Sequence, residues 1–132
     1  VPDVVRSIAL GRPIVLRNPA AVRPWQHVLE LCEGYLELGS RLIQGGFDYA
    51  EAWNFGPQGQ DDAPVLELAK QFLATMGRPE HPIEIQGESL KETQLLRLDI
   101  SKALARLDWR PRLTTRETLE WSAQWYCACH AG

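Results

Sequence analysis

The chain has 132 residues and a mass of 14.9 kDa, which suits one domain of ordinary size and leaves no room for two. Hydrophobic residues make up 45% and charged residues 23% of the sequence, so its composition is globular and excludes a disordered or fibrous protein. A net charge of -3 without a basic cluster excludes a nucleic-acid binder, and no apolar run is long enough to span a membrane. Three cysteines are too sparse for a disulfide framework and predict a reducing, cytoplasmic setting.

The first part of the chain predicts a helix, a strand and a long helix. Val1-Pro2-Asp3 opens a short helix that ends at Gly11, because proline and an acidic residue favour the first turn. Residues 13–17 form a β-prone run that Asn18-Pro19 closes. Apolar residues then recur at helical spacing over residues 28–43, and the opposite, charged face of this helix is expected to lie in water. That face carries Glu30, Glu33, Glu37 and Arg41, of which the last two are spaced to form an ion pair.

The middle of the chain predicts a strand and a capped helix. Residues 49–57 alternate and are rich in aromatic side chains, which is typical of a strand, and Gly56-Pro57 closes it. Asp61 or Asp62 is expected to cap a helix over residues 64–76. After it, residues 83–85 alternate over too few positions to define a strand, residues 86–94 indicate a loop, and residues 96–100 predict another short strand.

Two helices are predicted after this loop and strand. Ser101 is expected to cap a brief helix through Leu107, and Thr114 and Glu117 form a capping box that begins a C-terminal helix. Together the elements predict an α+β fold of about four helices with short strands. The apolar strand at residues 53–55 needs neighbours that these few strands barely supply, so we expect it to join a sheet outside this chain. The abrupt helical start without methionine leads us to expect a piece of a longer polypeptide.

The sequence carries no pattern for catalysis, a cofactor or a metal. It has neither the phosphate-binding G-x-x-x-x-G-K loop nor the dinucleotide fingerprint G-x-G-x-x-G, and no tyrosine is followed four residues later by lysine. Cys127 and Cys129 are two residues apart and would point to different sides of a helix, so a metal site there is not expected. We expect these two thiols to lie in a poorly ordered tail, and we expect no catalytic, cofactor-binding or metal-ligating residue in this chain.

Two arginines beside a turn are the candidate binding groups. Arg17 and Arg23 flank the turn after the first strand, and Trp25 and His27 follow them. A guanidinium offers a planar fork for phosphate oxygens, and an indole offers a face for stacking. In the alternative, structural interpretation, the arginines pair with nearby carboxylates, the indole belongs to the core, and His27 is a hydrogen-bonded imidazole without a ligand. The residues alone leave both interpretations open.

Several segments together resemble the CDP-glucose 4,6-dehydratase family of extended short-chain dehydrogenase/reductases. They are RNP at residues 17–19, RPWQHVLE at 23–30, GYL at 34–36, YAEAWNFGP at 49–57, LDISKA at 98–103, LDWRP at 107–111, and the Glu120-Trp121 and Trp125-Tyr126 pairs. The run from RNP to RPWQHVLE is particular to the CDP-glucose branch, whereas the WNFG and WRP elements recur in many nucleotide-sugar enzymes.

The resemblance implies that residues 1–132 are the small C-terminal, substrate-binding domain of such an enzyme, without its NAD-binding Rossmann domain. The implied reaction of the whole enzyme removes water from CDP-glucose and gives CDP-4-keto-6-deoxyglucose. Arg23 then corresponds to the arginine that grips the substrate diphosphate, Asn54 to the asparagine that supports the nucleotide, and Glu92 to the loop that folds over it. Further contacts to the substrate are implied at Arg17, Trp25 and His27.

Two other functions stay open on the sequence. One is a piece of another NAD-dependent nucleotide-sugar epimerase or dehydratase, which acts on a UDP or dTDP sugar. The other is a non-catalytic interaction module whose apolar surface binds itself or a partner. We expect the missing Rossmann domain as a partner, and we expect the chain to form a homo-oligomer because uncovered apolar edges promote self-pairing.

Overall fold

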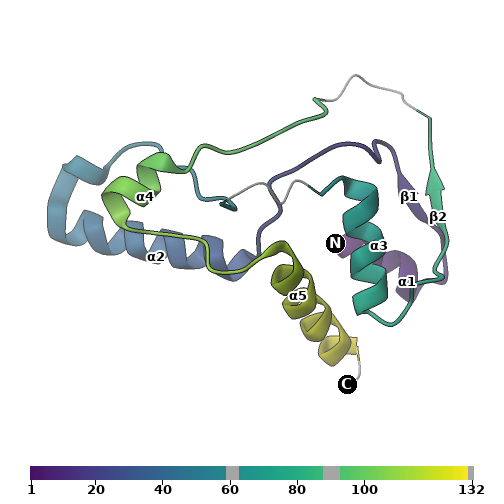
Figure 1. The fold of residues 1–132 in the computed structure, drawn as a ribbon. Coiled ribbons are helices and arrows are strands. Elements are labelled where there is room, and N and C mark those ends of the chain that lie inside the picture. Colours follow the sequence, from purple (N-terminus) through teal and green to yellow (C-terminus); the bar gives the residue numbers. More distant parts are fainter. Residues whose placement is uncertain (59–62, 88–92, 131–132) are drawn as a thin grey trace. The chain divides into compact units, whose positions relative to one another are not determined.

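The computed structural model describes residues 1–58, 63–87 and 93–130, which form two compact units (Figure 1). Unit 1 comprises Val1–Arg23, Asp62–Leu96 and Leu119–Gly132, and unit 2 comprises Pro24–Asp61 and Arg97–Thr118. The elements in chain order are α1 (Pro2–Ala9), β1 (Ile14–Leu16), α2 (Val28–Gly45), the 3-10 helix η1 (Gly46–Tyr49), α3 (Val65–Thr75), β2 (Ile83–Ile85), α4 (Ser101–Leu107) and α5 (Thr115–His130). The described residues thus contain five α-helices, each at a place where the sequence predicts a helix, so the summary of about four was one too few.

Unit 1 is built on a pair of short parallel strands. β1 pairs with β2, with Ile14 opposite Ile83 and Leu16 opposite Ile85, so the brief alternation at residues 83–85 is a strand. Ile14 and Leu16 are buried, and α1 contacts β1. The other buried apolar side chains of unit 1 are Val4, Val5, Ala21, Leu68, Ala69, Phe72, Leu73, Leu119 and Ala123. Segments that are far apart in the sequence therefore share one core.

Val22 links three segments of unit 1 through its backbone and that of its neighbour. Its N–H donates to the Gln94 carbonyl (2.7 Å), and its own carbonyl accepts from the Leu96 N–H (3.1 Å). The preceding Ala21 carbonyl accepts from the N–H of Val65 at the start of α3 (2.9 Å). These bonds satisfy main-chain groups that would otherwise be left without partners, and they fix the chain directly before Arg23.

Unit 2 consists of α2 and α4 around an aromatic core. Its buried cluster contains Phe55, Ile100, Ala103, Leu107 and Trp109. The rings of Phe55 and Trp109 meet edge to face with centroids 5.0 Å apart. Gly34 of α2 faces this core, where a Cβ atom would lie 2.5 Å from the Phe55 ring. The glycine therefore lets α2 approach Phe55 more closely than any other residue would.

Both strands predicted for this unit are wrong. Tyr49 ends η1, and residues 50–58 and 96–100 contain no strand. The alternation of Trp53 and Phe55 reflects instead that both side chains pack at the core cluster of unit 2. Within the described residues the only strands belong to unit 1, so residues 50–58 find no neighbouring strand with which to form a ladder.

The last helix, α5, begins where the sequence predicts it but ends later than predicted. The predicted capping box is confirmed: the Glu117 N–H donates to Thr114 Oγ1 (3.2 Å) and the Thr114 N–H donates to Glu117 Oε2 (2.8 Å). The predicted disordered tail is wrong, because α5 continues to His130 and includes Cys127 and Cys129. No glycine or proline interrupts residues 115–130, so the helix has no reason to end earlier.

The third helix begins later than predicted. Pro64 is the N-cap of α3, and Val65 is its first residue. Asp61 and Asp62, the predicted caps, lie outside the described residues. None of the helices in the described ranges is long and apolar enough to cross a membrane.

Candidate functional site

Arg23 lies in unit 1 and is held by main-chain carbonyls. Its Nη1 donates to the carbonyls of Val22 (2.9 Å), Thr93 (2.9 Å) and Gln94 (3.5 Å). The guanidinium thus connects the chain after the turn that follows β1 with residues 93–94, which follow β2 in the sequence. These three contacts of Nη1 are all to main-chain carbonyl oxygens, a structural role that neither interpretation of the sequence included.

Arg17 follows β1 directly and is exposed. It has no ion-pair partner among the described residues. The carboxyl ends of β1 and β2 lie at the same edge of the parallel pair, where the Gln86 N–H donates to the Leu16 carbonyl (2.9 Å). Arg17 therefore presents a cation at the edge where ligands of parallel sheets commonly bind. Glu92, the other predicted contact in this part of the chain, lies outside the described residues.

His27 and Trp25 lie in unit 2, where the chain enters α2. His27 is the N-cap of α2, and its Nδ1 accepts a hydrogen bond from the Leu29 N–H (3.2 Å). This is the structural role that the sequence left open for it. Trp25 is half-buried, and its indole N–H, like the amide nitrogen of Gln26, is buried without a hydrogen-bond partner in the described part of the chain.

Asn54 also lies in unit 2, on an exposed stretch of the segment between η1 and the core residue Phe55. Its Nδ2 donates to the Asp99 carbonyl (3.1 Å). The Asp99 side chain in turn accepts from the Ser101 N–H (2.8 Å) at the start of α4. The hydrogen bonds from Ser101 lower the pKa of Asp99 below its usual value. Asn54 is thereby connected to the beginning of α4.

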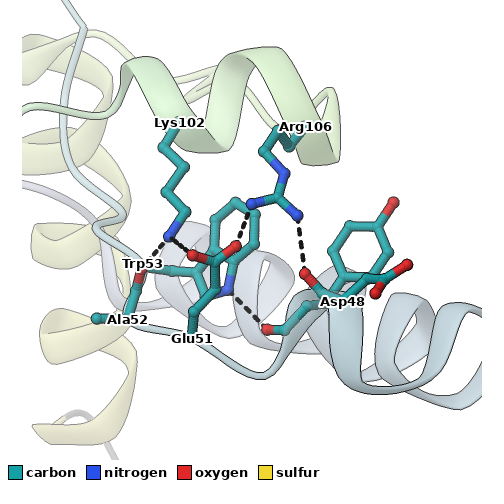
Figure 2. Close-up of polar contacts among 7 residues, drawn as sticks. Asp48, Glu51, Ala52, Trp53, Lys102 and Arg106 are labelled. Atoms are coloured by element: carbon teal, nitrogen blue, oxygen red, sulfur yellow. Dashed lines mark hydrogen bonds and ion pairs between the residues drawn. The ribbon is translucent and has the colours of Figure 1, made fainter.

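Beside Asn54, a cluster of polar and aromatic side chains joins α4 to residues 48–53 (Figure 2). Lys102 Nζ contacts Glu51 Oε2 (2.5 Å) and donates to the Ala52 carbonyl (2.9 Å). Arg106, one helical turn further along α4, pairs with the other oxygen of Glu51 and donates from Nη2 to the Asp48 carbonyl (2.8 Å). The hydrogen bond from Lys102, with a further one from Arg106, lowers the pKa of Glu51. We call Glu51, Lys102 and Arg106 the α4 clamp.

Two aromatic rings lie against the cations of the α4 clamp. Trp53 and Tyr49 stack with centroids 6.2 Å apart, and the Trp53 indole donates to the Tyr49 carbonyl (3.0 Å). Lys102 Nζ is 4.6 Å from the Trp53 ring centroid, and the Arg106 guanidinium is 5.3 Å from it. Cations over indole rings at these distances are attracted by the ring's electrons. The clamp and the two rings therefore hold residues 48–54 against α4.

A second anchoring contact in unit 2 comes from Glu30. This side chain is only 6% exposed, and Oε1 accepts the N–H of Arg112 (2.5 Å) and of Leu113 (2.8 Å). The prediction that Glu30 faces water is wrong, because the chain after α4 returns over this part of α2 and covers the carboxylate. Glu37 and Arg41 do form the predicted ion pair (2.7 Å).

An open cavity of about 870 Å³ lies beside α2 in unit 2. Its charged lining residues are Glu33, Glu37, Arg41, Asp108, Arg110 and Arg112. They form three pairs: Arg112 with Glu33 (2.8 Å), Arg41 with Glu37 (2.7 Å) and Arg110 with Asp108 (3.9 Å). Because each cation already has an acidic neighbour, this cavity is poorly suited to a diphosphate.

The structure therefore divides the predicted site residues between the units. Arg17 and Arg23 belong to unit 1, and Trp25, His27 and Asn54 belong to unit 2. The residues of the α4 clamp were not singled out from the sequence, although Lys102 and Arg106 have the i,i+4 spacing that lets two side chains reach one carboxylate. In the described ranges, no three His, Cys, Asp or Glu side chains are grouped to hold a metal ion.

Comparison with known proteins finds a relative that aligns with almost the whole chain. No family model matches it. It is, however, 37% identical over 129 residues to the CDP-glucose 4,6-dehydratase of Salmonella typhimurium, an alignment that covers 97% of this chain. The chain is homologous to CDP-glucose 4,6-dehydratase. It spans 36% of the length of that enzyme.

Solved structures of nucleotide-sugar enzymes share the fold of this chain. The dTDP-glucose 4,6-dehydratase of Bacillus anthracis, in complex with NAD, has a TM-score of 0.74 at 23% identity, over 96% of this chain and 38% of that one. The UDP-glucose 4-epimerase of Stenotrophomonas maltophila, with bound NAD and formylated UDP-arabinopyranose, has a TM-score of 0.78 at 20% identity, over 98% and 40%. At these identities the likeness concerns the fold alone, which occurs in both cases as part of a longer chain.

Proposed function

We propose that this chain is the C-terminal, nucleotide-sugar-binding part of a CDP-glucose 4,6-dehydratase and that its ligand is CDP-glucose. The observation that carries the proposal is the 37% identity to such an enzyme over 97% of the chain. The run from Arg17 to Glu30, whose pattern is particular to the CDP-glucose branch, supports the choice of nucleotide. The three cysteines are free thiols, which supports a cytoplasmic setting.

On this proposal Arg23 and Arg17 bind the diphosphate. The carbonyls of Val22, Thr93 and Gln94 hold Nη1 of Arg23 and orient its guanidinium, which carries a permanent positive charge that attracts anions. Arg17 adds a second, exposed cation at the carboxyl edge of β1. A hydrogen bond to a charged group contributes about 1.5–3 kcal/mol, which corresponds to about ten- to hundredfold in affinity.

The remaining contacts are proposed on the nucleoside side. Asn54 is exposed and fixed by Asp99, which suits a residue that hydrogen-bonds the nucleotide. Trp25 would stack on or support the base, and Glu92 would contact the nucleotide. His27 is proposed to act indirectly, because its Nδ1 is occupied by the α2 cap.

The chain binds but does not catalyse in this proposal. The dehydration of CDP-glucose to CDP-4-keto-6-deoxyglucose would take place in the complete enzyme, with NAD and the proton-transferring residues on its Rossmann domain. The residues of this chain do not fit NAD, because β1 and β2 have three residues each and no glycine fingerprint follows either strand. We therefore derive no catalytic step from this chain.

The proposed protein partner is that Rossmann domain. Residues 53–58 carry no strand, and in the described part of the chain their main-chain groups make no backbone–backbone hydrogen bond. Such a row of donors and acceptors is suited to pair with a strand of a neighbouring sheet. Leu36 and Ile43 of α2, which are 76% and 89% exposed, offer apolar surface for the same domain or for a second copy of the chain.

Calorimetric titration of the chain with CDP-glucose, and with CDP, UDP and dTDP in competition, tests the proposal. We expect CDP-glucose to bind, CDP to compete better than UDP or dTDP, and Arg23→Ala to weaken binding by about ten- to hundredfold. Arg6→Ala is the matched control, since it removes an exposed arginine of unit 1 that pairs only with Asp3 in the described residues. Equal affinities of the two variants, or no binding by the chain, would refute the proposal, and preferential competition by UDP or dTDP would reassign the nucleotide.

A further inference from the structure

The conformation of residues 50–54 raises the question of what fixes this segment. It carries no strand, and its backbone–backbone hydrogen bonds within the described residues are those of Ala50 and Glu51 to the end of η1. A segment without regular backbone hydrogen bonds is normally mobile, because ordering each residue costs conformational entropy. The order of this segment must therefore come from side chains.

The α4 clamp supplies this order from one side. Glu51 receives both Lys102 and Arg106, and the same two cations lie over the ring of Trp53 (Figure 2). A single exposed ion pair contributes little to stability, whereas here one carboxylate, two cations and an aromatic face form a network. Trp53, which supplies the aromatic face of this network, directly precedes Asn54.

Asn54 is in turn held directly before the start of α4, three residues before Lys102. The side-chain amide of Asn54 hydrogen-bonds to the Asp99 carbonyl, which can accept but cannot donate. The atom of Asn54 that faces this carbonyl must therefore be the amide nitrogen Nδ2. The amide carbonyl oxygen of Asn54 is consequently turned away from Asp99. It offers an acceptor, which suits a hydrogen-bond donor on the ligand such as a ribose hydroxyl or the exocyclic amine of cytosine.

We propose that Lys102 and Arg106 are positioning residues that act through Glu51 and Trp53 to orient the amide of Asn54 for a donor group of the nucleotide. Asp99, just before α4, then fixes the amide of Asn54, and Lys102 and Arg106 of α4 fix the preceding residues of the chain through Glu51 and Trp53. This proposal rests on the function proposed above, which assigns a nucleotide contact to the exposed Asn54.

Nuclear magnetic resonance of the chain tests the positioning without any ligand. We expect Glu51→Gln to shift the side-chain amide resonances of Asn54 and to speed their exchange with water. The matched control is Glu37→Gln, which breaks an equally exposed ion pair with Arg41 elsewhere in unit 2 and should leave these resonances unchanged. Lys102→Arg, which keeps the charge, should largely preserve the wild-type signals. An Asn54 signal that responds to Glu51→Gln no more than to Glu37→Gln overturns the proposal.

Titration with CDP then tests whether the positioning serves binding. We expect Asn54→Ala to weaken CDP by about two- to tenfold and Glu51→Gln by about two- to fivefold, with no further loss when the two are combined. Losses that multiply in the double variant overturn the proposed coupling. If Asn54→Ala leaves the CDP affinity unchanged, the nucleotide contact in the proposed function is refuted, and the amide resonances still decide the clamp. A parallel titration with UDP identifies the donor: a loss confined to CDP indicates the cytosine amine, and an equal loss indicates the ribose.

Discussion

The buried carboxylate of Glu30 gives the sharpest test of how unit 2 is held together. Its Oε1 accepts two consecutive main-chain N–H groups, those of Arg112 and Leu113, in a position only 6% exposed. Hydrogen bonds to a charged acceptor contribute about 1.5–3 kcal/mol each, and a donor left without a partner costs about 1–3 kcal/mol when buried. Arg112 itself is exposed, so water can replace part of the loss. We expect Glu30→Ala to lower the free energy of unfolding by about 2–4 kcal/mol.

A second substitution separates the hydrogen bonds from the charge. Glu30→Gln keeps an acceptor oxygen of the same reach but removes its charge, so we expect it to cost about 1–2 kcal/mol. Urea unfolding followed by circular dichroism measures both variants, and the alanine variant should shift the midpoint by about 1–2 M. The control is Glu33→Ala, which removes the exposed ion pair with the Arg112 side chain and should cost about 0.5 kcal/mol or less. If alanine at position 30 costs no more than alanine at position 33, the anchoring role of Glu30 is refuted.

Four further outcomes are expected. Gly34→Ala should destabilise the chain by about 1–3 kcal/mol, since the new methyl group meets the core ring, whereas Gly39→Ala, with open space around it, should be neutral or stabilising by up to about 1 kcal/mol in the same urea assay. Thr114→Ala should cost about 0.5–2 kcal/mol through loss of the capping box, measured by thermal unfolding; a loss below the error of the assay would contradict this. The lowered pKa of Glu51 stabilises the fold above the ordinary carboxyl pKa of about 4.3, so the advantage of the wild type over Glu51→Gln should shrink as the pH falls below that value; a constant difference in melting temperature would contradict the assignment. Sedimentation velocity at increasing concentration should show self-association through the exposed apolar face of α2, and a strictly monomeric profile would exclude it.

The elements that could be predicted from the sequence are those with a local cause. α2 follows from its apolar periodicity, and the start of α5 follows from the reciprocal bonds of Thr114 and Glu117, which need only residues three positions apart. Residues 49–57 show the limit of such patterns. Their aromatic alternation reflects the packing of Phe55 in the core and of the partly buried Trp53 against it. A strand also needs a neighbouring strand, which such a pattern does not indicate.

The residues of the candidate site show the same limit. The sequence singles out Arg23 by its motif, yet the carbonyls that hold it come from Thr93 and Gln94, about seventy positions away. Glu30 lies on the charged face of α2, and nothing local indicates that residues 112–113 return to cover it. Long-range contacts of this kind depend on the tertiary fold, which the periodicity of single elements does not specify.

The stretches of the two units alternate along the sequence, and this order determines when unit 1 can fold during synthesis. The polypeptide passes from one unit to the other four times, since unit 1 is made of three separate stretches and unit 2 of two. Leu119 and Ala123, which belong to the core of unit 1, lie in the last of these stretches. Almost all of residues 1–132 must therefore be synthesised before unit 1 can complete its core. For the same reason, neither unit can be excised or exchanged as one continuous piece of the gene.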